Sequence, residues 1–360
     1  MDGVISLGVG EPDFATPWHI RESAIRSLES GYTMYTSNFG ILELREEIAK
    51  YLGRRYEINY DPSNEIIVTV GVSEALDLVM RSIINPGDEV IVPEPTYVSY
   101  LPCITLAGGV PVTVSTHMEN SFQFDVTQIE NSITPRTKAI LIGYPNNPTG
   151  TVIPRTTLEA LATLATKHDL TVISDEVYER LVYGTEHVCF ASLPGMSHRS
   201  VHLGGFSKSY AMTGWRVGYA CSNSELIEAM MKIHQYTMLC APIQGQIAAL
   251  EALRSGDKSV EEMRQQYNQR RHVMINGLND LGLNCDTPKG AFYAFPSIKG
   301  LGLSSEEFAE SLLLQEKVAV VPGSAFGESG EGHIRCCYAV STNEIEEALV
   351  RISRFVKNLQ

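Results

Sequence analysis

The sequence contains no apolar run close to the ~20 residues that a membrane-spanning helix requires. Its first residues, Met1 to Leu7, hold no basic stretch followed by a long apolar one, so we expect no signal peptide. Basic residues are in the minority, because 28 Lys and Arg stand against 42 Asp and Glu and give a formal net charge of −14. Nucleic acid and anionic membranes repel such an acidic chain, and we expect neither as a partner.

Paired cysteine motifs are also missing. The seven cysteines are scattered and none stands in Cys-x-x-Cys spacing, so we expect no disulfide framework. We interpret the nine histidines as not clustered for metal binding, and we expect no metal. Scattered thiols in a chain of this length are typical of a reducing compartment, which favours the cytoplasm. No Gly/Ser-rich or Pro-rich linker interrupts the chain, so any domains should pack directly against each other.

What remains is the composition of a globular protein, with 44% hydrophobic and 19% charged residues over a length that suits about two domains. Short β-branched runs alternate with helical stretches through the middle of the chain. Continuous apolar runs of this kind predict strands that are buried on both faces and mostly parallel. The predicted strands are 65–70, 89–92, 110–114, 139–142, 171–174, 200–203 and 216–220.

This pattern predicts an α/β fold with a large domain over residues 31–281, in which a mostly parallel sheet of seven-stranded type lies between helices. From 282 to 360 the pattern changes to shorter strands and two late helices, around 305–316 and 343–359. We expect this segment to form a smaller α+β domain together with residues 1–30.

Lys208 lies in the most informative stretch, Gly205-Phe206-Ser207-Lys208, directly after the predicted strand 200–203. A lysine amine can form a Schiff base with an aldehyde. Ser207 precedes the lysine and Arg216 follows it, and a hydroxyl and a guanidinium are suitable ligands for a phosphate. These groups are the ones needed to hold pyridoxal phosphate. The simpler interpretation of this short segment alone is a surface lysine and an unrelated arginine.

Other candidate residues follow the ends of predicted strands, where ligands bind in α/β sheets. Val72 and Ser73 open a predicted helix whose free N–H groups can hold an anion. Tyr97 could stack on a flat ring, and Asn147 stands in a turn fixed by two prolines and a glycine. Taken singly, these residues also fit a helix cap, a core aromatic and an ordinary turn.

Asp175 and Tyr178 follow the predicted strand 171–174. A carboxylate at the end of a buried strand is costly unless it is paired. A protonated pyridine nitrogen is a suitable partner, because the charge keeps the ring an electron sink. Tyr178 could donate to the phenolic oxygen of the same ring.

In this combination and order, the elements resemble the class I and II aminotransferases of the fold-type I pyridoxal-phosphate superfamily. The resemblance covers almost the whole chain, from Ile5–Phe14 through Tyr35–Gly40 to Gly332–Ala339. Its most specific parts are the motif Asn147-Pro148-Thr149-Gly150 and the spacing from Ser207-Lys208 to Arg216.

The resemblance implies that pyridoxal 5'-phosphate is the cofactor. It makes Lys208 the Schiff-base lysine and general base, and Asp175 the partner of the pyridinium nitrogen. Asn147 and Tyr178 would bond the ring oxygen, and Tyr97 would stack on the ring. The cofactor phosphate would be held by Val72, Ser73, Ser207, Arg216 and, across a homodimer interface with shared active sites, Tyr35 of the partner subunit.

For the substrate, the resemblance implies that Arg335 grips the α-carboxylate with its planar fork, beside Asn147 and the backbone N–H of Gly10. The implied activity is amino-group transfer between an L-amino acid and a 2-oxo acid, with 2-oxoglutarate as the expected acceptor, by a ping-pong mechanism. A pyridoxal-phosphate-dependent carbon–sulfur lyase is an alternative, because it uses the same cofactor motifs. A non-catalytic ligand-sensing domain is another, although the negative charge argues against the DNA binding that such regulators carry out.

The amino donor stays open at this point. The residues of the side-chain pocket cannot be placed from the sequence, and no second arginine is assigned to a distal carboxylate. Aspartate, aromatic, alanine-like and diaminopimelate-pathway substrates all remain as candidates.

Overall fold

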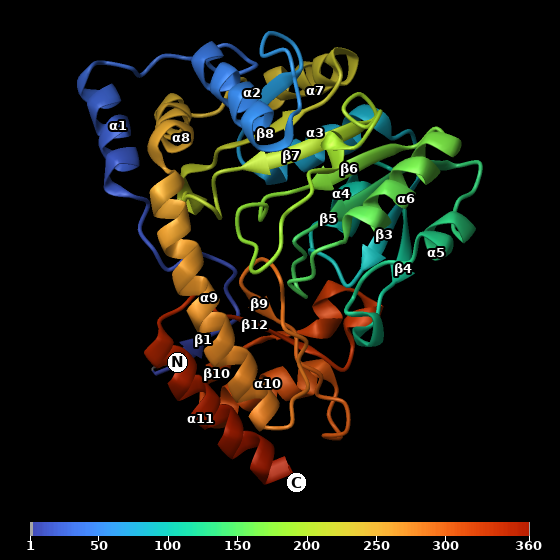
Figure 1. Cartoon of the computed structure of the whole chain (residues 1–360), viewed down its shortest axis with the longest axis vertical. Helices are drawn as coiled ribbons and strands as arrows, with labels where there is room; N and C mark the ends of the chain where they lie inside the picture. The colour runs from blue at the N-terminus through green and yellow to red at the C-terminus, as the bar shows by residue number, and fades with distance from the viewer. Residues whose placement is uncertain (1–2, 360) are drawn as a thin grey trace.

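A seven-stranded sheet forms the centre of the upper part of the protein in the computed structural model, which describes residues 3–359 (Figure 1). The strand order is β2-β8-β7-β6-β5-β3-β4, and β8 alone runs antiparallel to both of its neighbours. The strands are β2 Ile66–Thr69, β3 Glu89–Glu94, β4 Val110–Ser115, β5 Thr137–Gly143, β6 Thr171–Asp175, β7 Ser200–Gly205 and β8 Gly218–Cys221. The sheet expected from the sequence is therefore confirmed.

Both faces of this sheet are buried, as the continuous apolar runs predict. Ile66 and Val68 pack into one core cluster while Ile67 between them packs into another, because successive side chains of a strand point to opposite faces. Helices α3, α4 and α7 cover one face, and α2, α5, α6 and α8 cover the other. These helices are α2 Leu42–Tyr56, α3 Val72–Ile83, α4 Tyr100–Leu106, α5 Val126–Asn131, α6 Arg155–Lys167, α7 Ser224–Thr237 and α8 Ile243–Ser255.

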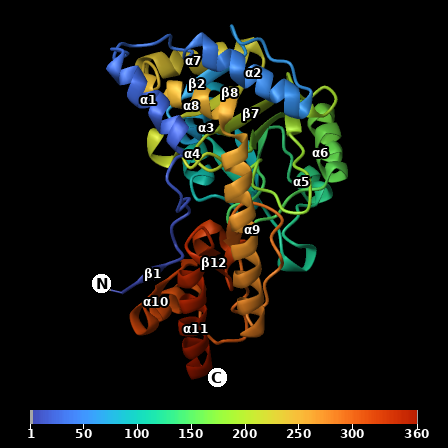
Figure 2. The same ribbon diagram turned by 60° about the vertical axis from the view of Figure 1, so that its left-hand side comes forward.

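The smaller part lies below the sheet and is reached by the long helix α9, Asp257–Asp280, which runs from beside α8 down to α11 (Figures 1 and 2). Helix α10, Ser305–Glu316, begins at a capping box in which Ser304 and Glu307 bond each other's backbone N–H groups. Helix α11 is Thr342–Leu359. The remaining strands are β9 Tyr293–Ala294, β10 Val318–Ala319, β11 Val321–Pro322 and β12 Ile334–Cys337.

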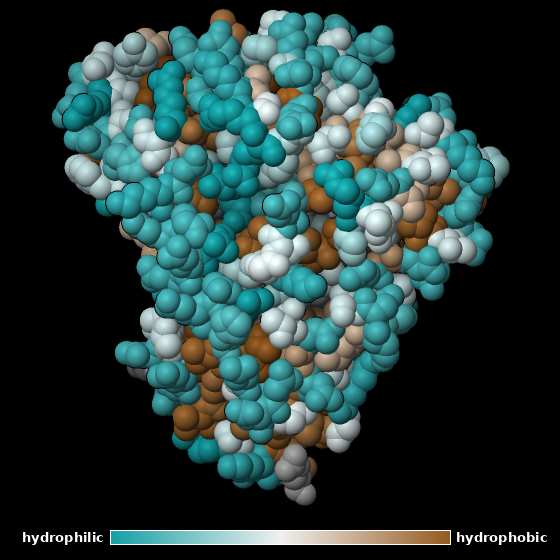
Figure 3. Space-filling model, in the orientation of Figure 1, coloured by the Kyte–Doolittle hydropathy of each residue, from teal (hydrophilic) through white to brown (hydrophobic). Residues whose placement is uncertain are grey.

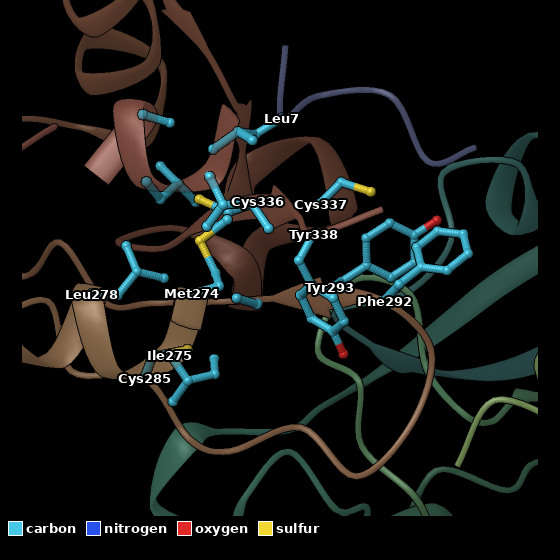
Figure 4. Close-up of a cluster of buried hydrophobic side chains, with 14 of the residues drawn as sticks. Leu7, Met274, Ile275, Leu278, Cys285, Phe292, Tyr293, Cys336, Cys337 and Tyr338 are labelled. Carbon is cyan, nitrogen blue, oxygen red and sulfur yellow. The ribbon is translucent and has the colours of Figure 1, made fainter. Parts of the chain in front are cut away.

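The core of the smaller part joins segments that are far apart in the sequence. Leu7 from the N-terminal segment, Met274 and Leu278 from α9, and Tyr338 after β12 belong to one buried cluster (Figure 4). Cys336 and Cys337 are buried in the same cluster and carry free thiols. Burial of these apolar groups fixes the position of β12, which matters because β12 carries Arg335.

The first 30 residues contact both parts of the protein. Strand β1, Ile5–Ser6, pairs with β10 in the smaller part, whereas helix α1, Trp18–Glu29, packs against α8 in the larger part. The division into a larger domain over residues 31–281 and a smaller one from residues 1–30 and 282–360 stays a proposal, and the packing of α1 against α8 favours assigning that helix to the larger domain.

The surface in Figure 3 is mostly hydrophilic, with hydrophobic residues in separate patches. Within residues 3–359, no helix has both the length and the apolar character needed to cross a membrane.

One local expectation is wrong. The run 216–220 predicts a strand that begins at Arg216, but β8 begins at Gly218. Arg216 instead follows the 3-10 turn Thr213–Trp215 in a left-handed conformation with φ 54°. The reversal of the chain at this residue aims its side chain toward the start of α3, where Arg216 Nη2 would lie 2.7 Å from a Cβ on Gly71.

The core of the smaller part predicts a stability difference along a single helix. Ile352 of α11 is fully buried, whereas Val350 on the same helix is 52% exposed. Ile352→Ala should destabilise the protein by about 2–5 kcal/mol, because the deletion leaves a cavity in a packed core. Val350→Ala should change stability by less than about 0.5 kcal/mol. Urea unfolding followed by circular dichroism measures both, and equal midpoints would contradict the packing described.

Candidate active site

A cavity of about 420 Å³ lies between the two parts, at the carboxyl ends of the parallel strands. Its wall contains predicted site residues from segments that are far apart in the sequence. They are Gly10, Val72, Ser73, Tyr97, Asn147, Asp175, Tyr178, Ser207, Lys208, Arg216 and Arg335. Tyr35 alone lies outside this wall and is 79% exposed.

Lys208 follows β7 and reaches into the cavity. Its Nζ donates a hydrogen bond of 2.7 Å to the carbonyl oxygen of Gly10. Burial lowers the pKa of Lys208 below its usual range. A lowered pKa increases the fraction of neutral amine near neutral pH, and the neutral amine is the form that attacks an aldehyde and accepts a proton.

Asp175 ends β6 with its side chain buried. Its carboxylate accepts hydrogen bonds from the Tyr100 hydroxyl at 2.9 Å and from the Val177 N–H at 3.2 Å. Burial raises the pKa of Asp175, although these two bonds act in the opposite direction. Both donors are neutral, and no lysine, arginine or histidine among the described residues forms an ion pair with this carboxylate. The group therefore suits a cationic ligand atom.

A turn between β2 and α3 forms a cradle for an anion. Gly71 has φ 80°, and a Cβ placed on Gly218 of β8 would lie 2.6 Å from the Val72 nitrogen, so the two backbones approach closely at this point. The first N–H groups of α3 face the cavity beside Ser73, and Ser207 and Arg216 line the same side. A helix N-terminus with a hydroxyl and a guanidinium beside it is a suitable phosphate site.

Arg335 of β12 also lines the cavity. Its Nη1 donates to Oδ1 of Asn147 at 2.9 Å, and its Nη2 donates to the carbonyl oxygen of Gly8 at 2.6 Å. The Nε atom is buried with no protein partner among the described residues. The guanidinium lies 4.6 Å from the ring centre of Tyr293 and 4.9 Å from that of Phe326, so both rings stack on it.

Asn147 owes its position to the preceding residue. The Oδ1 atom of Asn146 accepts hydrogen bonds from both the N–H and the hydroxyl of Thr149, at 3.1 and 2.9 Å. The Asn146 N–H also bonds the carbonyl oxygen of Thr151. This network closes the turn and leaves the Asn147 side chain free to point at Arg335.

The structure adds three aromatic residues that the sequence does not single out. They are Tyr100, which bonds Asp175, and Tyr293 and Phe326, which stack on Arg335. Tyr293 also shares a 2.6 Å hydrogen bond with the hydroxyl of Tyr178. The sequence offers one signal for Tyr100, which lies three positions after Tyr97. It offers none for Tyr293, because β9 is only two residues long and gives no periodic pattern.

On the other face of the sheet from Asp175, the buried carboxylate of Glu176 accepts several hydrogen bonds. It accepts hydrogen bonds from Ser174, from the Phe190 N–H and from His187. Burial acts to raise the pKa of Glu176, but the neighbouring His202 and His187 outweigh it and hold the pKa below its usual range. The cluster anchors the segment that follows β6, between Asp175 and Tyr178.

Two arrangements here bear on metal binding. The expectation of no metal overlooks one His-x-x-x-His spacing, formed by His198 and His202. Because His202 lies in strand β7, these two side chains do not form the ligand pair that this spacing gives on a helix. The ligand atoms of Glu176, Cys189 and His202 lie within 4.8 Å of one another. The Glu176 oxygens already accept the hydrogen bonds described above, so this cluster is explained without an ion.

Comparisons with known proteins agree with this geometry. The family model for aminotransferase class I and II matches residues 2–352. A putative aminotransferase, YugH, of Bacillus subtilis is 55% identical over 99% of this chain and 92% of its own length. An aspartate aminotransferase of Pyrococcus abyssi is 47% identical over the same shares of the two chains. The crystal structure of an aromatic aminotransferase from Pyrococcus horikoshii superposes with a TM-score of 0.97 at 45% identity, covering 99% of this chain and 97% of that one.

The residues of the cavity also fit the cofactor of that family, because a reactive amine, a buried carboxylate without a cation and an anion cradle surround one space. The chain belongs to the class I and II aminotransferases of the fold-type I superfamily, enzymes that depend on pyridoxal 5'-phosphate.

Proposed function

We propose that the enzyme moves an amino group between an L-amino acid and a 2-oxo acid, with 2-oxoglutarate as an acceptor, and that Lys208 is its catalytic base. The observation that carries the proposal is the meeting of Lys208, Asp175 and Arg335 around one cavity. Relatives with high identity over nearly the whole chain are named aminotransferases, which disfavours the lyase and ligand-sensing alternatives. Their names include both aspartate and aromatic substrates and leave the donor open.

Pyridoxal phosphate, when bound, supplies the electron sink that makes the substrate α-carbon acidic. Around it, Asp175 would provide a fixed negative charge for the ring nitrogen. Asn147 and Tyr178 would donate to the ring oxygen, and Tyr97 would stack on the ring. Val72, Ser73, Ser207 and Arg216 would hold the phosphate.

Lys208 has two roles that depend on its neutral amine. Its Nζ would hold the cofactor covalently, and the free amine would accept the substrate α-proton and donate a proton again later in the transfer. Burial of the amine supports both, because it lowers the pKa toward the working range. Arg335 orients the substrate by its α-carboxylate, together with Gly10 and Asn147.

A homodimer with shared sites is part of this proposal. Exposed hydrophobic side chains gather on α1, on the segment that follows it, and at the end of α7. They include Trp18, Ile25, Leu28, Tyr32, Met34, Tyr35, Tyr236 and Met238. The segments lie side by side, because the Gln244 side chain of α8 bonds the Tyr32 carbonyl oxygen and Asn38 bonds Gln235 of α7. Exposed apolar side chains on neighbouring segments suit burial in a dimer, where Tyr35 would reach the phosphate of the partner's site. We also place the enzyme in the cytoplasm, in keeping with seven free cysteines.

The assignment of Lys208 is tested by chemical reduction of its link to the cofactor. Borohydride reduction of the holoenzyme followed by peptide mapping should locate the cofactor on Lys208. Lys208→Ala should still bind the cofactor but lose turnover by about three orders of magnitude or more, because one amine serves as anchor and base. A reduced label on Lys138 or any other lysine would overturn the assignment.

Substitutions of Arg216 and of Arg335 should affect different ligands. Arg216→Ala should raise the dissociation constant of the cofactor, whereas Arg335→Ala should leave it unchanged and weaken both the amino donor and the oxo acceptor. The expected loss at Arg335 is about 2–5 kcal/mol, as found when one partner of a buried charge pair is removed. Cofactor titration and single half-reaction kinetics measure these effects. Arg335→Lys should behave nearly as poorly as Arg335→Ala, since an ammonium cannot copy the planar fork.

Shared sites are tested by mixing two defective proteins, Lys208→Ala and Tyr35→Phe. If Tyr35 serves the site of the partner subunit, each mixed dimer contains one site with both residues intact. Activity at low cofactor concentration should then exceed the sum of the separate proteins. Additive activity after subunit exchange, or a fully active monomer, would rule out the shared arrangement.

A further inference from the structure

We propose that the preferred amino donor carries an aromatic or large apolar side chain rather than a second carboxylate. This inference rests on the proposed function and adds the substrate class to it. It comes from the charges of the cavity wall and from the apolar residues around Arg335.

Every charged side chain of the cavity wall already has a role. The wall contains four such residues, namely Asp175, Lys208, Arg216 and Arg335. The first three act on the cofactor, and the guanidinium of Arg335 is reserved for the α-carboxylate. Among residues 3–359, the wall therefore offers no further cation for a distal carboxylate.

The surroundings of Arg335 are apolar. Val321 of β11 stands directly opposite Arg335 of β12 in the antiparallel register, so the two side chains share one face. Val321, Phe326, Tyr97 and Val98 all line the cavity. A donor bound at Arg335 would thus extend its side chain along Val321, Val98 and the ring of Phe326, which suits an aromatic or large apolar group.

Two carboxylates lie close to residues of the wall. Glu94 is buried next to Gly327, directly after Phe326, where a Cβ would lie 2.7 Å from its carboxylate oxygens. Glu11 accepts a hydrogen bond from the hydroxyl of Thr213, which lines the cavity. A second carboxylate on the substrate would lose its hydration at this wall without gaining a cationic partner from it.

The test uses the holoenzyme and two readouts. In the amino half-reaction, followed by loss of the visible absorbance of the cofactor, phenylalanine and tyrosine should react about 10–100-fold more efficiently than aspartate and glutamate. In binding titrations without turnover, 3-phenylpropionate should bind more tightly than succinate. Phenylpyruvate should serve as an acceptor at least as well as 2-oxoglutarate.

A charge-adding pair of variants locates the pocket. Val98→Lys places a cation at the cavity wall and should raise the ratio of aspartate to phenylalanine efficiency by about fivefold, the value of a partly exposed ion pair. Leu106→Lys is the matched control, because Leu106 ends the helix that begins at Tyr100, is 71% exposed and lies outside the cavity wall. If the ratio of aspartate to phenylalanine efficiency is the same in the two variants, Val98 is not part of the side-chain pocket.

The outcomes separate this inference from the proposed function. If aspartate or glutamate reacts best with the wild-type enzyme and succinate binds more tightly than 3-phenylpropionate, the substrate class is wrong although the enzyme is an aminotransferase. If no amino acid changes the absorbance of the bound cofactor while borohydride still labels Lys208, the proposed transfer itself fails.

Discussion

The site depends above all on a carboxylate kept at the end of a buried strand. Asp175 lies where β6 leaves the centre of the sheet, and its two hydrogen bonds come from neutral donors. Burial without a cation raises its pKa, so an apoprotein holds this charge at a cost. A protonated pyridine ring beside it would remove the cost and would itself be held in the charged form. Under the proposed role of Asp175, the same electrostatic demand would favour the cofactor and keep its ring charged.

Two hydrogen bonds connect the larger part of the protein with the smaller one across the cavity. Tyr178 after β6 shares its hydroxyl with Tyr293 of β9, and Asn147 after β5 accepts from Arg335 of β12. In each pair, one residue is assigned to the cofactor and the other lies on the substrate side. The position of β12, set by the buried cluster around Leu7 and Cys336, is thus linked to the residues that are proposed to contact the cofactor. A change in how the two parts pack would alter substrate binding and the cofactor surroundings together.

Much of this arrangement could be predicted from the sequence, for identifiable reasons. The strands around Ile140 and Val172 are continuous β-branched runs, and helix α10 begins at a capping box, so local chemistry alone defines them. The residues after the strands could be gathered into one site because carboxyl ends of parallel strands share one edge. Tyr100 and Tyr293 could not be placed, since their importance lies in contacts made across 75 and 115 positions of the chain. Arg216 was expected in a strand because its neighbours are apolar, whereas its left-handed backbone is imposed by packing against Gly71.

The environment of Arg335 also limits how a substrate can approach it. Tyr293 and Phe326 stack on the guanidinium, so hydrogen bonds can form only at its edge. Asn147 and the Gly8 carbonyl oxygen already accept from the two terminal nitrogens, while Nε is buried without a protein partner. An unpaired buried donor is costly, and a carboxylate that lies in the plane of the guanidinium removes that cost. Under the proposed role of Arg335, a substrate carboxylate would therefore meet the guanidinium at its edge. The rings stabilise the cation and would leave an apolar surface beside it for the rest of the substrate.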